Sequence, residues 1–244
     1  MRDFVLGWLA LRPGYIGFSY LDEAVRRGTS GIELAFGERF HDYMRARPDD
    51  ARRYEAAMES TVEGFEDAAL AYDFSRFRRV VDVGGGQGSF LVAIRRHHPG
   101  VTGVLFDLPD VVAGAPARLA GYPESPGIEV AGGDMFTRVP ASGDAYLFST
   151  VLRCFADQDC ARVLRNCREA MAAGGRVLAV EMLMDDGIPP SPMGLADLQA
   201  LAVYGGKDRT RQEWTALMTG AGFAAPAFHP ADAPYWIIEA CQQA

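Results

Sequence analysis

The chain has few of the features that mark a membrane, metal-binding or disulfide-rich protein. Its 244 residues include four cysteines and four histidines, and none of them has the spacing of a metal site. No two cysteines form a Cys-x-x-Cys pair, so neither a zinc site nor a disulfide framework is indicated, and reduced thiols in a cytoplasmic protein are expected. The early apolar run, Phe4 to Leu11, is too short to span a bilayer and has no small-residue cleavage site.

Basic residues are also in short supply. Lys and Arg number 24 against 32 Asp and Glu, which gives a formal net charge of -8 at pH 7. Nucleic acids and anionic membranes attract positively charged surfaces, so neither is expected as the main partner. The apolar share of 49% and the charged share of 23% are typical of a globular protein with one large domain, or one domain and an extra lobe.

A glycine-rich stretch organises the chain, although it lacks one glycine of the dinucleotide fingerprint. Arg79–Phe90 reads RVVDVGGGQGSF, which predicts a strand, a sharp turn and the start of a helix. The fingerprint Gly-x-Gly-x-x-Gly, counted from Gly84, requires a glycine at Ser89. Asp82 stands two residues before the first glycine, where a carboxylate would lie beside the ligand. This position suits a cationic group such as the ammonium of an amino acid.

Residues 1 to 75 predict helices and show no strand-like alternation. The clearest helices are expected at Tyr15 to Arg27 and at Pro48 to Tyr72. In the second helix, apolar residues recur at steps of three and four and predict one buried face: Tyr54, Met58, Val62 and Phe65. Core packing on that face is one interpretation of Met58. We therefore expect a helical lobe over 1–75 that contributes to a substrate pocket and to an oligomer interface.

Strands and helices alternate from Val80 onward, which predicts an α/β fold with a parallel, Rossmann-like sheet and helices on both faces. The expected elements are strands 80–83, 102–106, 128–130, 145–150 and 176–182, and helices 87–97, 110–120, 157–172, 194–204 and 211–220. Two last strands, 223–228 and 235–241, are joined by Pro- and Asp-rich residues and should pair antiparallel at the sheet edge. Residues 76–244 thus form the predicted ligand-binding domain.

Three acids follow successive predicted strands. Ligands of open α/β sheets bind at the carboxyl ends of the strands, where Asp82, Asp107 and Asp134 stand. Asp107 is placed to bind two ribose hydroxyls. Asp134 precedes Met135 and Phe136, a combination that suits the edge and face of adenine. Each acid alone could be a surface cap, but three in succession favour a ligand site.

Several motifs resemble the small-molecule O-methyltransferases that use S-adenosylmethionine (SAM). The pattern Asp-x-Gly-x-Gly-x-Gly resembles the first motif of SAM methyltransferases, and further motifs recur in order: Phe106–Pro109, Gly133–Phe136, Val151–Leu152 running to Asp159–Cys160, and Gly205–Thr210. The similarity covers roughly Leu34 to the C-terminus. Plant members of this family methylate phenylpropanoids and flavonoids, and bacterial members tailor polyketides and other secondary metabolites. The resemblance implies a class I SAM methyltransferase fold.

The resemblance also implies functional residues. Those expected to bind SAM are Asp82, Gly84, Gly86, Asp107, Leu108, Asp134, Met135, Phe136 and Ser149. Met58 matches a family methionine that packs near the substrate. With it, His41, Asp197 and Tyr204 are expected to contact substrate, and His41 is also a candidate substitute base.

The chain departs from the family pattern where the base should stand. The family's catalytic histidine is replaced by Arg153, and the acid and tryptophan that follow it are Cys154 and Phe155. A family lysine becomes Ser149. A guanidinium offers only donors and stays protonated, so it cannot accept a proton. We expect Arg153 to hold an anionic substrate group or an oxyanion, or else to be a simple ion-pair partner of Asp157.

Two glutamates that flank the histidine in plant enzymes match Glu181 and Asp208, which are expected to position Arg153. Methyl transfer would then depend on positioning of an acidic hydroxyl rather than on a base.

Three functions therefore remain open. The first is O-methylation of a small aromatic or polyketide-like metabolite. The second is another SAM-requiring reaction on the same fold, such as decarboxylation, hydroxylation or cyclisation, for which a guanidinium could bind a carboxylate. The third is a truncated subunit that requires a partner. Most of the family's N-terminal dimerisation domain is missing from the sequence, so a homo-oligomer or a separate N-terminal-domain chain is expected.

Overall fold

The computed structural model describes residues 11–59, 63–184, 192–231 and 234–243, and it divides the chain into two compact units. The helical unit contains Met1–Thr61, Arg153–Ala156 and Met184–Thr210, and the sheet unit contains the remainder. This division does not follow the expected boundary at residue 75. Helix α7 (Glu63–Ala71) contacts α8 (Ser89–His97) of the sheet unit, and two later segments belong to the helical unit.

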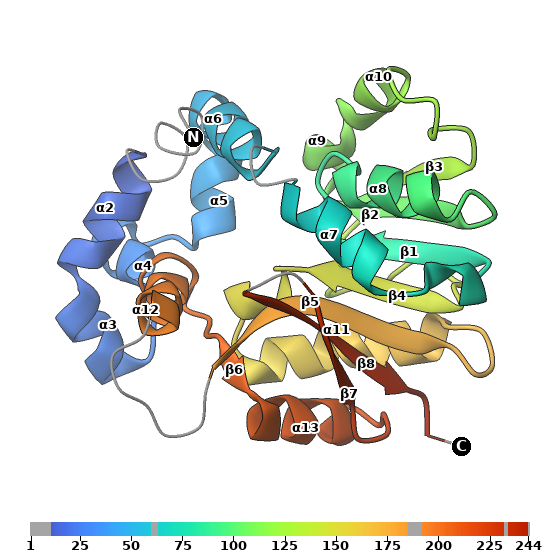
Figure 1. The fold of residues 1–244 in the computed structure, drawn as a ribbon. Coiled ribbons are helices and arrows are strands. Elements are labelled where there is room, and N and C mark those ends of the chain that lie inside the picture. Colours follow the sequence, from blue (N-terminus) through green and yellow to red (C-terminus); the bar gives the residue numbers. More distant parts are fainter. Residues whose placement is uncertain (1–10, 60–62, 185–191, 232–233, 244) are drawn as a thin grey trace. The chain divides into compact units, whose positions relative to one another are not determined.

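The sheet unit has the predicted class of fold: a mixed sheet with a parallel central part and antiparallel C-terminal strands (Figure 1). Its strands run in the order β3-β2-β1-β4-β5-β8-β7. Their bounds are β1 Arg79–Val83, β2 Thr102–Asp107, β3 Ile128–Gly132, β4 Ala145–Ser149, β5 Arg176–Met184, β7 Ala227–Pro230 and β8 Tyr235–Cys241. The apolar residues of β1 are fully buried, as expected for a central strand that is covered on both faces.

Helices cover both faces of this sheet. In Figure 1, α8 and α9 (Pro109–Val112) lie on one side, and α11 (Asp157–Ala170) and α13 (Arg211–Gly220) lie on the other. Short 3-10 turns at Phe74–Arg76 and Leu152–Cys154 precede β1 and α11.

Several predicted elements differ from the structure in their extent; the helix expected at 48–72, for example, is described as α6 Pro48–Glu59 and α7 Glu63–Ala71. The helix expected over 110–120 is two helices, α9 and α10 (Ala115–Leu119), because Pro116 lacks an N–H and starts a new first turn. The strand expected at 223–228 is confined to Ala227–Pro230, since Pro226 interrupts the ladder. The helix expected at 15–27 breaks near Ser19, whose hydroxyl donates to the carbonyl of Ile16 (2.6 Å).

The helical unit packs around its own apolar cluster. Its helices are α2 Arg12–Ser19, α3 Leu21–Arg27, α4 Gly31–Phe36, α5 Phe40–Arg45, α6 Pro48–Glu59 and α12 Pro192–Tyr204; the unit also contains the two-residue strand β6 Arg209–Thr210. The buried members of the cluster are Leu11, Ile32, Phe40, Tyr43, Met44, Ala57 and Val203. Met58 and Tyr204 pack against it. Of the other residues on the face predicted for 48–72, Val62 and the side chain of Phe65 lie outside the described part.

Glycines allow α2, α4 and α12 to approach closely. A Cβ on Gly17 would lie 2.7 Å from the carbonyl oxygen of Ala202, and a Cβ on Gly31 would overlap the carbonyl oxygen of Gly17. Backbone atoms cannot move aside as a flexible side chain can. The three helices therefore depend on the absence of side chains at Gly17 and Gly31.

Gly31→Ala is expected to lower the free energy of unfolding by about 1–3 kcal/mol, because overpacking displaces backbone. Urea denaturation followed by circular dichroism measures the change. Gly220→Ala is the matched control, since a Cβ there meets nothing within 4 Å. Equal stability of Gly31→Ala and the parent would contradict the close packing of α2 and α4.

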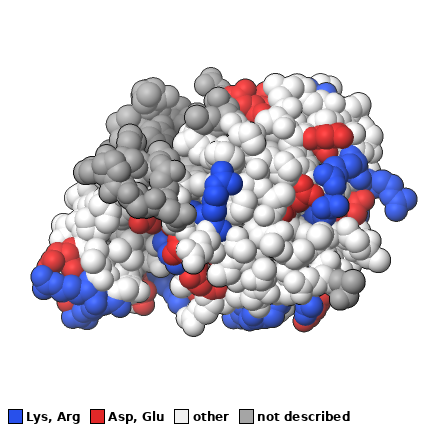
Figure 2. All heavy atoms as spheres, turned by 60° about the horizontal axis from the view of Figure 1, so that its bottom comes forward, with Lys and Arg blue, Asp and Glu red and all other residues white. Residues whose placement is uncertain are grey.

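The described surface carries both signs of charge. Acidic and basic side chains lie in small mixed groups on the face that Figure 2 shows. Ion pairs one helical turn apart on the described surface include Arg26–Asp22 and Arg27–Glu23. Within the described residues, every helix is too short or too polar to cross a bilayer.

Candidate functional site

The glycine turn after β1 is pinned to the end of β2. Gly84, Gly86 and Gly88 have φ values of 74°, 58° and 88°, a region that side chains with a Cβ rarely adopt. The N–H of Gly84 donates to the carbonyl of Phe106 (2.8 Å), and the N–H of Gly86 donates to Oδ2 of Asp107 (2.9 Å). The turn and the first strand-end acids are thus held at one edge of the sheet.

Asp82 is a buried carboxylate without a hydrogen bond to any described residue. It pairs in register with Leu105 and Leu147, in the middle of the sheet, and is 1% exposed. A Cβ on Gly85 would lie 2.5 Å from its Oδ2, so the carboxylate lies directly against the glycine turn. Burial, followed by the charge of Asp107, raises the pKa of Asp82 to about 7. An unpaired buried acid of this kind fits a cationic ligand group.

Asp107 presents a carboxylate held by backbone donors. Its Oδ1 accepts the N–H of Leu108 (2.7 Å), while Oδ2 accepts that of Gly86. Burial raises the pKa of Asp107, and these two bonds oppose the shift. The remaining lone pairs of a fixed carboxylate can accept two neighbouring hydroxyls.

The other predicted residues lie near the ends of β3 and β4. Asp134 is exposed and accepts the N–H of Phe136 (2.9 Å), which shapes the turn carrying Met135. The hydroxyl of Ser149 is buried and has no hydrogen-bond partner in the described chain. Thr150, the next residue, has φ 53°, and backbone strain of this kind is often found at functional sites.

The sheet edge therefore has donors and acceptors for a composite ligand. Asp82 suits a cation, Asp107 suits a diol, and the half-buried Met135 and Phe136 suit a flat ring. Two buried polar groups, Asp82 and Ser149, remain for the ligand to satisfy. The nine residues predicted to bind the cofactor fit this ligand, although their individual contacts stay predictions.

Arg153 is locked into an ion pair within the helical unit. Its Nε and Nη2 donate to Oδ1 and Oδ2 of Asp208, both at 2.7 Å, and Nη2 also donates to the carbonyl of Ala196 (2.9 Å). Arg153 is 8% exposed and Asp208 5%. Such a two-pronged, buried pair largely neutralises the guanidinium. Asp197, predicted to contact substrate, accepts the backbone N–H of Asp208 (2.8 Å).

The loop after α12 fixes the segment that carries Arg153. A Cβ on Gly206 would overlap the carbonyl oxygen of Arg153, and Arg209 donates from Nη2 to the carbonyl of Phe155 (2.9 Å). In the sheet unit, Oε1 of the buried Glu181 accepts the N–H of Leu152 (2.9 Å). The structure therefore joins Asp208 to the Arg153 side chain and Glu181 to the backbone of Leu152. The catalytic roles of all three stay predictions.

Aromatic rings surround His41 and Tyr204. The His41 ring is nearly parallel to those of Phe155 and Tyr204, with centroids 5.6 and 6.2 Å away. The hydroxyls of Tyr54 and Tyr204 lie 3.0 Å apart, and burial, followed by Tyr54, raises the pKa of Tyr204 well above its usual value. Burial lowers the pKa of His41 to about 4. The negative charge of Asp42 opposes this shift, and the positive charge of Arg45 adds to it. With this lowered pKa the imidazole is neutral at pH 7.

The helical unit contains a pocket, and the sequence predicted that the helical lobe contributes to a substrate pocket but could not orient the side chains that line it. Its lining includes Phe40 and Met44 from α5 and Gln199 and Val203 from α12. Each pair is separated by four residues, which places its members on one helix face. This spacing was the available signal, but it does not show which face encloses a cavity.

Comparison with known proteins places these features in a family. Residues 18–224 match the model of the O-methyltransferase domain. The chain is 36% identical over 233 residues to O-demethylpuromycin-O-methyltransferase of Streptomyces alboniger, covering 91% of this chain and 61% of that protein. It is 38% identical over 203 residues to phenazine-1-carboxylate N-methyltransferase of Pseudomonas aeruginosa, covering 83% of this chain and 60% of that protein. The chain thus spans about three fifths of the length of the curated relatives it matches.

Solved structures agree with the sequence matches. LaPhzM superposes with a TM-score of 0.90 at 34% identity, covering 95% of this chain and 70% of that one. NcsB1 is an O-methyltransferase from neocarzinostatin biosynthesis whose structure is in complex with SAM and 2-hydroxy-5-methyl naphthoic acid. It superposes with a TM-score of 0.89 at 29% identity, covering 99% of this chain and 73% of that one. The family match, its relatives and the fold lead to one conclusion: the chain belongs to the O-methyltransferase domain family.

Proposed function

We propose that this chain binds SAM and transfers its methyl group to a hydroxyl of a small aromatic or polyketide-like metabolite. The observation that carries the proposal is the unpaired, buried Asp82 against the glycine turn, because SAM has an ammonium group to place there. The SAM complex of NcsB1 and the names of the relatives support the assignment. When bound, SAM supplies a methyl group on a sulfonium that a nucleophile displaces.

The chain's own residues would hold the cofactor and exclude water. Asp82 would bind the ammonium, Asp107 the ribose hydroxyls, and Met135 and Phe136 the adenine, with Asp134 at its edge. Gly84 and Gly86 allow close approach of the backbone, and Leu108 and Ser149 complete the lining. Met58 is proposed on the substrate side because the family resemblance implies it, and His41, Asp197 and Tyr204 are proposed to contact substrate with it.

Arg153 cannot remove the substrate's proton, and Asp208 already neutralises much of its charge. The acceptor hydroxyl should therefore be acidic enough to ionise with little help, and positioning would supply most of the rate. We keep Arg153 as a catalytic candidate through its pairing with Asp208, with Glu181 holding the backbone beside it. Incubation with SAM and a panel of phenols of graded pKa, followed by mass spectrometry, tests the proposal. A gain of one methyl supports it, whereas another mass change would indicate a different SAM-requiring reaction.

A nitrogen acceptor is the second candidate. An aromatic or tertiary nitrogen attacks through a free lone pair and needs no base, which suits a chain with Arg153 at the base position. The names of two relatives state N-methylation of phenazine-1-carboxylate and of 8-amino-8-demethylriboflavin. Methylation of azaarenes, with phenols unchanged in the same assay, would favour this candidate.

Asp107→Ala is expected to weaken SAM binding by about 1.5–3 kcal/mol, because ribose hydroxyls lose a charged acceptor. Isothermal titration calorimetry on the parent and the variant measures the difference. Asp110→Ala, three residues along the chain, controls for a general change of charge. An unchanged affinity in Asp107→Ala would remove this residue from the site.

We further propose that the protein is cytoplasmic and associates with a second copy or with a separate N-terminal-domain chain. The apolar run at 4–10 lies outside the described residues, and Val25 and Leu70 are 56% and 60% exposed. A contiguous apolar patch often marks an interface, and the sequence of the 4–10 run is apolar enough to form one. Sedimentation of a monomer at micromolar concentration, with no partner recovered from the source cells, would count against association.

A further inference from the structure

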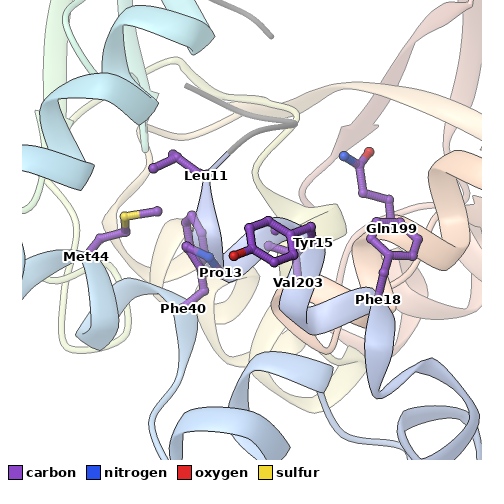
Figure 3. A pocket seen from close by; sticks show the side chains of 9 residues that line it. Leu11, Pro13, Tyr15, Phe18, Phe40, Met44, Gln199 and Val203 are labelled. Atoms are coloured by element: carbon purple, nitrogen blue, oxygen red, sulfur yellow. The ribbon is translucent and has the colours of Figure 1, made fainter. Parts of the chain in front are cut away.

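The pocket in the helical unit is open to solvent on one side and is lined almost entirely by apolar side chains. It is lined by Leu11, Pro13, Gly14, Tyr15, Phe18, Phe40, Met44, Gln199 and Val203. Figure 3 shows Leu11 and Met44 toward one side, Phe18 and Gln199 toward the other, and Tyr15 between them. Helices α2, α5 and α12 therefore supply three walls of one cavity.

The size of the cavity fits a single aromatic ring with a small substituent. Its volume is about 170 Å³. An engineered apolar cavity of about 150 Å³ in another protein binds benzene. Rings of Phe18 and Phe40 offer edge and face contacts that aromatic ligands favour.

Two polar groups interrupt this apolar lining. Gln199 is half-buried, and its amide makes no hydrogen bond to another described residue. Tyr15 is 58% exposed, and its hydroxyl likewise has no partner in the described part. An amide that faces an apolar pocket can both donate to and accept from a ligand hydroxyl or carbonyl. Every described lining residue is uncharged.

We propose that this pocket binds an uncharged aromatic ring of the substrate and that Gln199 determines specificity by hydrogen bonding to a hydroxyl or carbonyl on that ring. The inference rests on the proposed function for the identity of the ligand as a methyl acceptor. It adds that the recognised ring is neutral, in contrast to the anionic group expected from Arg153. Burial of a carboxylate against these apolar walls would be unfavourable because none of the described lining residues is a cation that could pair with it.

Fluorine NMR on the full chain tests the pocket without any turnover. The probes are 4-fluorophenol, fluorobenzene and 4-fluorobenzoate, which share a ring and differ in the polar group. We expect 4-fluorophenol to bind the parent with a dissociation constant of roughly 0.1–1 mM. The benzoate should bind at least about ten-fold more weakly than the phenol because of its charge.

Variants of α12 distinguish the effect of filling the cavity from the effect of removing the Gln199 hydrogen bond. Gln199→Trp should weaken both neutral probes about ten-fold or more by occupying the cavity. Gln199→Leu should weaken only 4-fluorophenol, about three- to ten-fold, and leave fluorobenzene unchanged. Leu195→Trp is the matched control, because Leu195 is on the same helix, 65% exposed, and does not line the pocket.

SAM affinity, measured on each variant by calorimetry, keeps the outcomes distinct. If SAM fails to bind the parent, the proposed function fails, while the probe data still decide the pocket. Equal probe binding by Gln199→Trp and the parent would overturn the pocket proposal, as would tight binding of the benzoate. If Gln199→Leu lost affinity equally for 4-fluorophenol and fluorobenzene, the proposed role of Gln199 in hydrogen bonding would be overturned.

Discussion

Arg153→Ala is expected to lower the free energy of unfolding by about 3–5 kcal/mol, the cost of leaving a buried charge without its partner. The backbone N–H of Asp208 would keep its hydrogen bond to Asp197. Its carboxylate, however, would lose both hydrogen bonds from the guanidinium, and Asp208 is only 5% exposed to water. The carbonyl of Ala196 would also lose its donor. Urea denaturation at pH 7, followed by circular dichroism, measures the loss.

Two further variants distinguish the contribution of the Arg153–Asp208 ion pair from that of side-chain packing. Arg153→Lys should recover only part of the stability, because an ammonium cannot make the two-pronged contact. The double variant Arg153→Met with Asp208→Leu should be much more stable than Arg153→Ala, since no buried charge is left. Equal stability of Arg153→Ala and the parent would show that the pair contributes nothing to the fold.

The same variants test the catalytic role of Arg153. If the guanidinium still contacts an anion or oxyanion, the folded Arg153→Lys variant should show a higher Michaelis constant and lower turnover at unchanged SAM affinity. Arg153→His, in contrast, should not improve the native reaction but should extend methylation to less acidic phenols. Full activity of the charge-free double variant would end the case for Arg153 as a catalytic residue.

Asp82 is expected to make the ligand-free protein lose stability as pH rises. Its pKa is about 7 in the fold against 3.8 in the unfolded chain, so the folded state holds the proton more tightly. The stabilisation is complete below pH 3.8, is lost progressively up to pH 7, and changes little above that. Between pH 5 and 8 this group should account for a loss of about 2–3 kcal/mol.

Asp82→Asn isolates this contribution from other titrating groups. The difference between parent and variant in unfolding free energy, measured by urea denaturation from pH 5 to 8, should follow the predicted slope. SAM binding should strengthen over the same range, because its ammonium favours the ionised carboxylate. Parallel stability curves for parent and variant would show that Asp82 titrates at its ordinary pKa.

Local sequence patterns predicted the sheet well and the helix boundaries less well. Runs such as Val80, Val81 and Val83 are typical of buried strands in any context, and glycines at fixed intervals predict the turn that follows. Pro116 and Pro226 were visible in the sequence, but their effect depends on the hydrogen bonds they interrupt. The grouping of α12 with the N-terminal helices depends on contacts such as Gly17 against Ala202, which no local pattern contains.

The candidate site shows the same limit. Acids at successive strand ends were predictable because parallel strands share one carboxyl edge. Local spacing pointed to Asp157 as a simple ion-pair partner of Arg153. Only the family resemblance pointed to Asp208, 55 residues away, with which the structure pairs the guanidinium. Gln199 escaped notice because a single amide in an apolar helix gives no periodic signal.

The interleaving of the two units has a consequence for synthesis on the ribosome. Helices α2 to α6 emerge early, but their apolar cluster includes Val203 of α12, which emerges only after β5. At bacterial-to-eukaryotic elongation rates this interval lasts roughly 7–30 s. Throughout that time Phe40, Met44 and their neighbours have an incomplete core and are exposed to aggregation or chaperone binding. A nascent chain arrested before α12 has left the ribosome should therefore be protease-sensitive in α2 to α6, and arrest after α12 has fully emerged should protect them.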